Sequence, residues 1–434
     1  MISKLKPKSE FAKNVISLAS GSAIGSAIIF LTVPVIARLY LPEDYGKFQI
    51  FASIIIIFSV ISSFKFELAL VLPKDRAESN AVLTLSLFFL IFTTVIFGII
   101  LYLTGASILR IMNAEVLQPY LLTILFGIFC AGFIQIGQYL FVRENAFKKA
   151  GANRIFQSSI SQGMKIGIGL MWPSFLGLYI SQLTGYLVAG YLAFARCKFD
   201  VVLSIQKLTK VFYKYKKFMY FTTPSVFMNI LSLNLPVFLL GKYHGPEAIA
   251  YYVMAVKLID APMGLIGGAI GQVYFKNAAD TFHKGPNDFF TLYKNTVKKL
   301  ALLFIGPTIF VFLFSKILVP TVLGEKWVLA ISVIEIVVFW KFFDFIYSSV
   351  STSLATLERQ GFEYVYRAIF LVARFLSLYL FQNNFHNSII AYSIVSILYN
   401  LTYIITVYII IKLDIHRKEY NLKLFKNKRK YVAK

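Results

Sequence analysis

The stretch that decides the fold spans residues 81–104 and reads AVLTLSLFFLIFTTVIFGIILYLT. None of these 24 residues is charged. A helix of about 20 apolar residues is long enough to cross the hydrocarbon core of a lipid bilayer, which is about 30 Å thick. The stretch therefore predicts a transmembrane helix.

Similar apolar stretches recur along the whole 434-residue chain. Hydrophobic residues make up 58% of it and charged residues only 15%, compared with about 25% in soluble domains. This composition excludes a disordered chain and a coiled coil. It also excludes a soluble enzyme, because a soluble protein of this size cannot bury so much apolar surface in its core. We predict an all-α polytopic membrane protein with about twelve spans, at 14–37, 48–63, 81–104, 119–142, 155–171, 174–195, 219–241, 248–272, 298–319, 328–350, 365–382 and 388–411.

Cysteines, histidines and catalytic motifs give no sign of an enzyme. The two cysteines, Cys130 and Cys197, lie in or beside apolar stretches, which argues against a disulfide framework. The four histidines are far apart, without the spacing of a metal site. The sequence contains no phosphate-binding lysine loop, HExxH or GxSxG motif. We therefore predict no cofactor, no metal and no enzymatic activity.

The net charge is +24, and most of the Lys and Arg residues lie in the predicted loops. In a soluble protein this charge would suggest a nucleic-acid partner, but in a membrane protein it indicates basic cytoplasmic loops. If the N-terminus lies inside, 34 of the 44 Lys and Arg residues fall in inside segments and six at outside ends. Both termini are therefore predicted to be cytoplasmic, and we expect membrane lipids rather than nucleic acid as partners.

The two halves of the chain share a proline pattern. Pro34 and Pro236 lie 202 residues apart, and Pro42 and Pro246 lie 204 apart. Coincidence is one explanation, because proline is common near helix ends. The other is a parallel repeat, with the two halves related by an axis along the membrane normal. On that basis we predict an N-terminal six-helix lobe at 1–205, a C-terminal six-helix lobe at 206–411 and a basic cytoplasmic tail at 412–434.

Seven ionisable residues fall inside the predicted spans. A charge at the centre of a bilayer costs about 2.5–3.5 kcal/mol on insertion scales, so each such residue is a candidate for function. Four cations and three anions give a slightly positive interior, which favours an anionic substrate. The seven residues are Lys165, Lys257, Asp260, Glu335, Lys341, Asp344 and Arg374.

Four of these residues form two pairs at helical spacing. Lys257 and Asp260 are three residues apart and share a helix face, as do Lys341 and Asp344. Each pair either neutralises itself and tolerates burial, or contributes to a functional site. The sequence leaves this choice open.

The remaining three residues have no local partner. Lys165 and Arg374 each need a carboxylate on another helix, a ligand anion or a wet cavity, and we predict that both line a cavity. Glu335 is either their counter-charge or a proton-coupling carboxylate, and the sequence does not decide between these roles.

Several short motifs resemble one known family. Taken together, in order and spacing, they are similar to the polysaccharide flippases of the MOP superfamily, the Wzx-type O-antigen transporters. The motifs are RLYLPEDYGKF at 38–48, FKFELA at 64–69, RENAF at 143–147, AYYVMAVK at 250–257 and GEKW at 324–327. In the second motif, Lys65 stands where the family usually has arginine, so the charge is kept but the bidentate fork is lost.

The resemblance implies a fold, a substrate and a set of partners. The implied fold is two six-helix lobes around a central cavity that opens to one side at a time. The implied substrate is an oligosaccharide on undecaprenyl diphosphate, moved from the inner to the outer leaflet of the bacterial cytoplasmic membrane. Glycan polymerase and chain-length machinery are the expected protein partners, beside the membrane lipids.

The resemblance also implies site residues. Related flippases hold the diphosphate with cationic cavity residues, and Lys65 and Lys257 match those positions. Lys165 and Arg374 join them only through the argument from burial. The residues expected to form charge pairs or to couple transport to an ion are Glu67, Asp260, Glu335, Lys341 and Asp344.

Three other functions are compatible with a polytopic membrane protein. One is a purely structural scaffold, which seven buried charges make expensive. A cation-coupled multidrug or small-molecule exporter of the same superfamily needs unpaired acids, whereas here Lys165 and Arg374 are the residues without partners. A membrane-embedded glycan polymerase usually carries a large outward loop, and every predicted outward loop is short.

Overall fold

The computed structural model describes residues 10–111, 115–357 and 359–432. Over these ranges the chain is almost entirely helical and contains no strand. Residues 1–9, which carry the first predicted inside lysines, and residues 433–434 of the basic tail lie outside the described residues.

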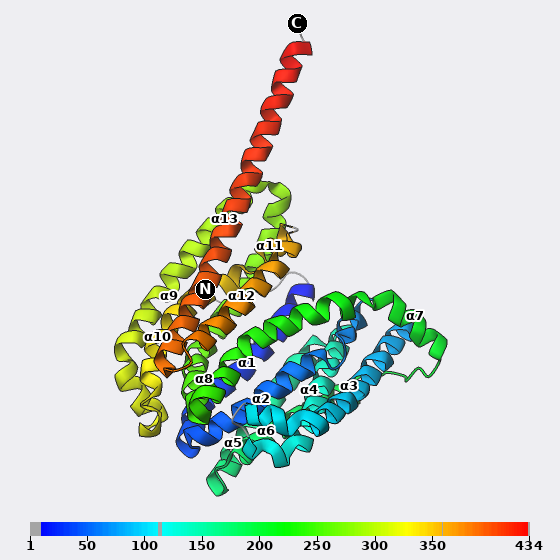
Figure 1. Cartoon of the computed structure of the whole chain (residues 1–434). Coiled ribbons are helices and arrows are strands. Elements are labelled where there is room, and N and C mark those ends of the chain that lie inside the picture. Colours follow the sequence, from blue (N-terminus) through cyan, green and yellow to red (C-terminus); the bar gives the residue numbers. More distant parts are fainter. Residues whose placement is uncertain (1–9, 112–114, 358, 433–434) are drawn as a thin grey trace.

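Six long helices form the N-terminal lobe (Figure 1). Helix α5 packs between α1 and α6, while α4 contacts α2, α3 and α6. The helices of this lobe are α1 (Glu10–Leu39), α2 (Pro42–Ile61), α3 (Arg76–Ile111), α4 (Leu121–Arg143), α5 (Phe147–Met171) and α6 (Phe175–Ala195).

The C-terminal lobe is built around one long helix that crosses twice. Helix α8 is interrupted at Gly245, whose φ of 83° and ψ of 176° are not helical. A glycine accepts this conformation without steric cost, and Pro246 then starts the second half of the helix. With this break, the described ranges hold twelve long helical segments. The helices of this lobe are α8 (Thr223–Lys284), α9 (Pro286–Leu323), α10 (Ala330–Val350), α12 (Gln360–Leu380) and α13 (Phe385–Val432).

Short elements connect the long ones. The predicted boundary between the lobes, at 205/206, falls at the start of α7, and it stays a prediction. Helix α13 continues past the bundle, so the predicted tail begins as an extension of the last helix (Figure 1). The short elements are η2 (Phe66–Val71), η3 (Glu115–Tyr120), α7 (Ile205–Tyr215), η4 (Phe218–Thr222), η5 (Glu325–Trp327) and α11 (Ser353–Thr356).

Several of the predicted spans start earlier than expected, and α9 by the most, at Pro286 instead of residue 298. The second was predicted from residue 48, but α2 begins at Pro42, because a proline in the first turn is pre-organised for a helix. Glu43 and Asp44 in the same turn also favour the positive end of the helix dipole. The fifth was predicted from residue 155, but α5 begins at Phe147 with a polar first half.

The two lobes contact each other at one end. The indole Nε1 of Trp327 donates to the backbone oxygen of Ala37 at 2.8 Å, and Arg38 Nη2 donates to the backbone oxygen of Thr321 at 2.5 Å. Here Gly46 lies so close to Pro246 that an added Cβ would be 1.8 Å from the proline oxygen. We name this region, formed by the turns at 39–42 and 323–330 and the break at Gly245, the closed end.

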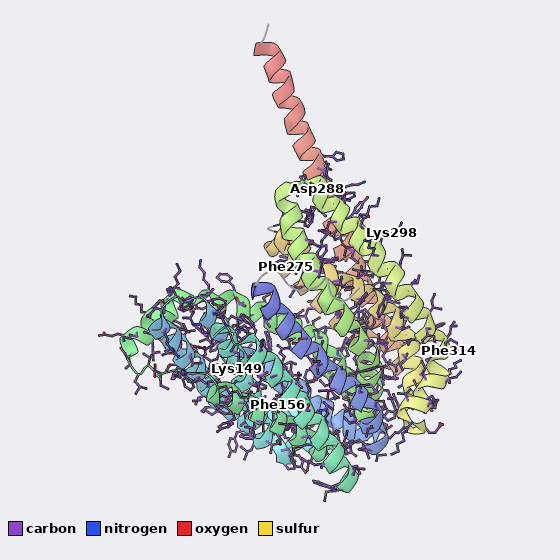
Figure 2. All side chains as sticks on the ribbon, turned by 180° about the vertical axis from the view of Figure 1, so that it is seen from behind. Lys149, Phe156, Phe275, Asp288, Lys298 and Phe314 are labelled. Atoms are coloured by element: carbon purple, nitrogen blue, oxygen red, sulfur yellow. The ribbon has the colours of Figure 1, made fainter. Side chains whose placement is uncertain are left out.

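The opposite end of the molecule is where the lobes separate. Figure 1 shows them diverging toward the end that carries α7 and the extension of α13. Figure 2 shows Phe156 on α5 and Phe314 on α9, on the outer surfaces of the two lobes, where they are 47% and 43% exposed. Such exposed aromatic side chains are expected where a protein faces lipid rather than water.

Candidate functional site

The second half of α8 brings Lys257 from the C-terminal lobe to α2 of the N-terminal lobe. Its Nζ donates to the hydroxyl of Tyr45 at 2.7 Å and lies 5.0 Å from the centroid of the same ring. The ring of Trp327 meets that of Tyr45 edge-on, with 5.8 Å between centroids. Lys257 is therefore held beside the closed end, on the boundary between the lobes.

Lys165 approaches the same helix from α5. Its Nζ donates to Oε1 of Gln182 at 2.8 Å and lies 5.0 Å from the ring centroid of Phe48. Phe48 is three residues after Tyr45 on α2, and their ring centroids are 6.1 Å apart. Two lysines from different lobes thus rest on adjacent aromatic rings of one helix face, where cation–π attraction favours them.

These two lysines have no anionic partner in the part of the chain that the structure describes. The ion pairs found there involve neither Lys165, which is 7% exposed, nor Lys257. The rings on which they rest, Phe48 and Tyr45, are neighbours on α2, so the two ammonium groups occupy adjacent places between the lobes. We call them the lysine pair. Desolvated like charges are costly unless an anion joins them, so the arrangement is suited to an anionic ligand.

A second charged cluster joins α8 to α10. Lys341 Nζ lies 2.7 Å from Oδ1 of Asp260 and 3.3 Å from Oδ2 of Asp344. Lys341 thus contacts Asp344 on its own helix, as their spacing allows. It also reaches across from α10 to Asp260, so the partner of Asp260 is Lys341 and not Lys257. The side chains of Asp260 and Asp344 are 44% and 33% exposed, so this cluster borders open space.

Arg374 is buried among aromatic rings in the C-terminal lobe. Its Nη1 donates to Oγ of Ser232 on α8 at 3.0 Å, and its guanidinium lies 4.7 Å from the ring centroid of Tyr399 and 5.8 Å from that of Tyr392 on α13. No described carboxylate forms an ion pair with it, so of the three partners that the sequence left open, a carboxylate on another helix is not the one found here. The arginine links α8, α12 and α13, and its predicted role in substrate binding stays a prediction.

Glu335 does not supply a counter-charge to the isolated cations. Its Oε1 accepts from Oγ of Ser315 on α9 at 3.3 Å, and within the described residues it forms no ion pair with Lys165 or Arg374. The counter-charge hypothesis is therefore wrong for this structure, while a coupling role stays a prediction.

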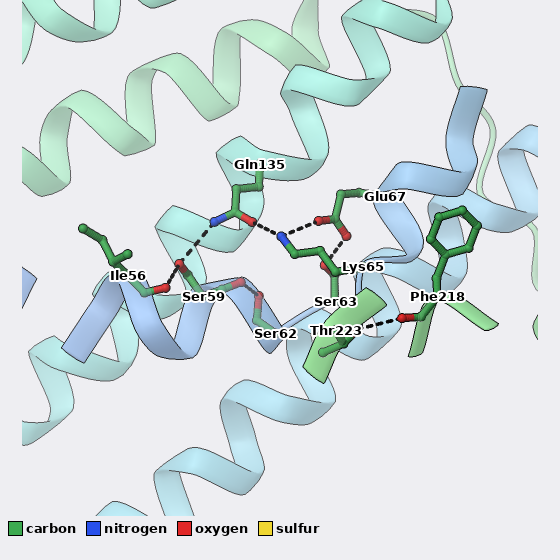
Figure 3. A network of polar contacts seen from close by, with 9 residues as sticks. All are labelled: Ile56, Ser59, Ser62, Ser63, Lys65, Glu67, Gln135, Phe218 and Thr223. Atoms are coloured by element: carbon green, nitrogen blue, oxygen red, sulfur yellow. Dashed lines mark hydrogen bonds and ion pairs between the residues drawn. The ribbon is translucent and has the colours of Figure 1, made fainter. Parts of the chain in front are cut away.

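Lys65 lies in a polar network at the end of α2 (Figure 3). Its Nζ is 3.2 Å from Oε1 of Glu67, a fully buried side chain that also accepts from Ser63 Oγ at 2.5 Å. Phe64 and Lys65 both have positive φ, 47° and 59°, which is a costly conformation for side-chain-bearing residues. Unlike the lysine pair, Lys65 already has a counter-charge.

The N-terminal lobe also contains a polar cavity of about 370 Å³ that the sequence interpretation missed. It lies among α1, α2, α4, α5 and α6, and five glutamines line it: Gln135, Gln138, Gln157, Gln162 and Gln182. A signal was present, because all five fall inside three consecutive predicted spans, where amide side chains are rare. The interpretation followed charges alone and therefore passed over them.

Comparison with known sequences gives a family match. A family model described as "Polysaccharide biosynthesis protein" matches residues 35–332. Among curated proteins, the teichuronic acid biosynthesis protein TuaB of Bacillus subtilis (strain 168) is 26% identical over 275 residues. That match covers 62% of this chain and 55% of the relative, so the likeness spans about half of TuaB's length.

Comparison with solved structures gives the same fold at low identity. The lipid II flippase MurJ, in an inward closed conformation, aligns with a TM-score of 0.73 and 13% identity over 92% of this chain and 90% of that one. An inward-facing multidrug resistance MATE family transporter of the MOP superfamily aligns with a TM-score of 0.70 and 14% identity, over 89% and 95%. These likenesses confirm the predicted fold of two six-helix lobes.

Proposed function

Because the chain belongs to the polysaccharide biosynthesis protein family, we propose that it flips a lipid-linked oligosaccharide across the membrane. The protein is a multi-pass membrane transporter and not an enzyme. The finer proposal is that the substrate is a surface-polysaccharide repeat unit on undecaprenyl diphosphate, such as an O-antigen unit. TuaB is named for teichuronic acid biosynthesis and MurJ for flipping lipid II, and a lipid-linked glycan unit is the substrate class that fits both names.

The lysine pair carries this proposal. A diphosphate is the anionic part of such a lipid, and it gains most from ammonium donors in a low-dielectric setting. Lys165 and Lys257 come from different lobes, so an anion bound between them would contact both halves of the transporter. A ligand that contacts both lobes can bias the equilibrium between their arrangements, as alternating access requires.

The direction of transport follows from the predicted topology. By the distribution of Lys and Arg, the closed end faces outward and the diverging end faces the cytoplasm, where the substrate is made. The lipid tail stays in the bilayer while the glycan and diphosphate pass between the lobes. A membrane potential of 100 mV, positive outside, favours outward movement by about 2.3 kcal/mol for each net negative charge.

One charged cluster is also compatible with the alternative, a cation-coupled exporter. Asp260 and Asp344 share one lysine and are partly exposed, so their cluster has a formal charge of −1. Such a cluster suits a proton or sodium ion as well as a cationic drug. In a flippase the same carboxylates would couple glycan transport to an ion. The cluster therefore fits both functions and does not decide between them.

Complementation tests the proposed function. The protein is expressed in a bacterial strain that lacks its own O-unit flippase, with several different glycans tested. Surface glycan and the cytoplasmic-leaflet pool of lipid-linked units are both measured. We expect the wild type to restore surface glycan, and Lys165→Gln and Lys257→Gln at matched expression to leave lipid-linked units on the cytoplasmic side.

An exposed lysine provides the control. Lys298 on α9 is exposed and labelled in Figure 2, so Lys298→Gln removes the same charge without touching the lysine pair. It should behave like the wild type. No restoration with any of the glycans, together with new drug resistance, would contradict the proposal and support the exporter.

A further inference from the structure

The glutamine-lined cavity of the N-terminal lobe has an unusual lining for the interior of a membrane protein. Beside the five glutamines, five serines line it, and Arg154 at its exposed edge is the one charged residue among the described lining residues. Its volume of about 370 Å³ lies in the range of small-molecule sites, roughly 300–1,000 Å³. None of the described lining residues carries a carboxylate, so the lining is unsuited to a cationic ligand.

Two of the glutamines have amide groups without a protein partner. Polar side chains inside membrane proteins often join helices by hydrogen bonds, which is the structural explanation for such a lining. Gln162 fits that explanation, because its Oε1 accepts from Thr32 of α1 at 3.3 Å. The side chains of Gln138 and Gln157 form no hydrogen bond within the described chain, and both are partly exposed at the cavity, so their amides are open to a ligand or to water. Helix packing alone does not account for them.

The cavity is connected to the lysine pair. Gln182 lines it, and Oε1 of this glutamine accepts both from Lys165 at 2.8 Å and from Ser161 at 3.3 Å. On another side, Gln135 donates to Ser59 at 3.2 Å and accepts from Lys65 at 3.4 Å (Figure 3). A group bound in the cavity would therefore contact Gln182, which is hydrogen-bonded directly to Lys165, and would lie beside an anion held by that lysine.

We propose that this cavity is a glycan subsite, which binds a neutral sugar of the lipid-linked substrate while the lysine pair holds the diphosphate. The inference rests on the proposed function. In a lipid-linked glycan the first sugar is bonded directly to the diphosphate, so the two groups must occupy neighbouring sites. The link through Gln182 and Lys165 supplies that adjacency.

The chemistry of the lining matches a sugar more closely than other uncharged ligands. Each sugar hydroxyl both donates and accepts hydrogen bonds, and each glutamine amide offers two donors and an acceptor. The serine hydroxyls likewise serve in either role. A site built to bond hydroxyl and amide groups discriminates strongly against a ligand that lacks them, because its own polar groups are then left unpaired.

A binding experiment separates the sugar from the diphosphate. Purified full-length protein in detergent is titrated with two probes: bare polyprenyl diphosphate, and the same lipid bearing one N-acetylglucosamine. Binding is followed by native mass spectrometry. The test variant is Gln138→Ala/Gln157→Ala, chosen because neither side chain bonds to the protein. We expect it to bind the sugar-bearing probe at least tenfold more weakly than the wild type, and the bare probe equally well.

Two further variants give the comparison. Lys165→Gln should weaken the binding of both probes. Thr184→Ala, on α6 two residues beyond Gln182, removes a hydroxyl that bonds only its own helix at Ile180 and should change neither. Thermal unfolding without ligand checks that the glutamine variant folds, and Gln138→Ala and Gln157→Ala are measured singly if it does not.

The outcomes distinguish the two levels of inference. Equal binding of both probes by the wild type, or unchanged binding of the sugar-bearing probe by the glutamine variants, would overturn the subsite while leaving the flippase proposal intact. A wild type that binds neither probe would overturn the proposed function and the subsite with it. Weaker binding of both probes by the glutamine variants would show that the cavity is not specific for the sugar.

Discussion

Lys65 and the lysine pair show how the same residue type takes different roles in one molecule. Lys65 is paired with a buried carboxylate at a turn where two successive residues have positive φ, whereas the lysine pair has no anion. The resemblance to flippases assigned Lys65 and Lys257 the same task. Their surroundings instead suggest that Lys65 stabilises the turn after α2, while Lys257 stays available to a ligand.

Double substitution tests the structural role of Lys65. Removing one partner of a buried ion pair costs about 3–5 kcal/mol, because the other charge is left uncompensated. We expect Lys65→Met and Glu67→Gln each to lower the thermal unfolding midpoint in detergent, and Lys65→Met/Glu67→Gln to recover most of the loss. If Lys65→Met abolished transport at an unchanged midpoint, Lys65 would instead be a substrate ligand.

The cluster around Lys341 allows a similar test, in which one lysine is shared by two carboxylates. Lys341→Met leaves two carboxylates without their shared cation, so we expect a loss in unfolding free energy that is smaller than for a fully buried pair, because both carboxylates are partly exposed. Adding Asp260→Asn should restore part of it. Asp260→Asn alone should be mild, because Lys341 keeps Asp344 as its partner. The check is thermal unfolding of the three variants, and equal losses in all three would contradict this account.

At the residue scale, the sequence predicted which charges are buried but not which residues they meet. Lys341, Lys165 and Arg374 were all singled out by their place within apolar spans. The partner of Asp260 is on another helix, and spacing along one helix contains no information about such neighbours. The glutamine cavity was missed for a related reason: each amide is unremarkable alone, and only the packing of five helices brings them together.

At the scale of single elements, α7 is the clearest case of a helix held by one face. Val211 and Tyr215 are buried against the N-terminal lobe, and the ring of Phe212 stacks on that of Phe66 with 5.9 Å between centroids. Lys214 adds a contact of 2.5 Å to Glu78 on α3. Phe66 directly follows Lys65, so α7 covers the turn that holds the buried ion pair.

Limited proteolysis of the linker at 196–222 tests what holds α7 in place. Aromatic pairs contribute about 0.5–1.5 kcal/mol beyond the area they bury, so Phe212→Ala should speed cleavage clearly. Tyr213→Ala, which alters the exposed neighbour, should not. Glu78→Gln should have a small effect, because its partner Lys214 is on the solvent side of the helix. Faster cleavage in Glu78→Gln than in Phe212→Ala would reverse this ranking.

The same contact gives a pH dependence. The hydrogen bond with Glu78 raises the pKa of Lys214 above its ordinary value. A raised lysine pKa stabilises the docked helix fully below the ordinary lysine pKa of about 10.4, and the contribution is lost as the pH rises through the raised value. We therefore expect cleavage of the linker to be constant between about pH 7 and 9 and to increase only above pH 10. An increase near pH 8 would contradict this assignment.

At the element scale, the sequence predicted the number of spans better than their limits. Eight helices in the described ranges are long and apolar enough to cross a membrane by length and composition alone, and one of them is the double-crossing α8. Helices α5, α10 and α12 fall short because each carries several polar or charged residues, among them Lys165, Lys341 and Arg374. Polar residues inside a span therefore weaken the hydropathy pattern by which a membrane helix is recognised.

At the scale of the whole molecule, the closed end is the contact that the proposed alternating access would have to open. Gly46 has no room for a side chain against Pro246, so Gly46→Ala should force the lobes apart at this end. Spin labels at Leu41→Cys and Leu329→Cys, in a background without Cys130 and Cys197, report the separation. We expect Gly46→Ala to lengthen that distance and to reduce transport.

Gly163→Ala is the matched control for this prediction. A Cβ at Gly163, within α5, would meet nothing within 4 Å, so the distance between the labels should not change. If both glycine variants gave the wild-type distance, the close approach of Gly46 and Pro246 would not be what sets the arrangement of the lobes.

The polarity of α5, α10 and α12 has a consequence for the insertion of the protein into the membrane during synthesis. As the nascent chain leaves the ribosome, each helix is offered to lipid, and Arg374 alone adds about 2.5–3.5 kcal/mol to the cost of insertion. The partners of Arg374 are Ser232 on α8 and the tyrosines of the later α13. We therefore expect α12 to insert stably only after α13 has been synthesised, and a chain truncated after α12 to be less stable in the membrane.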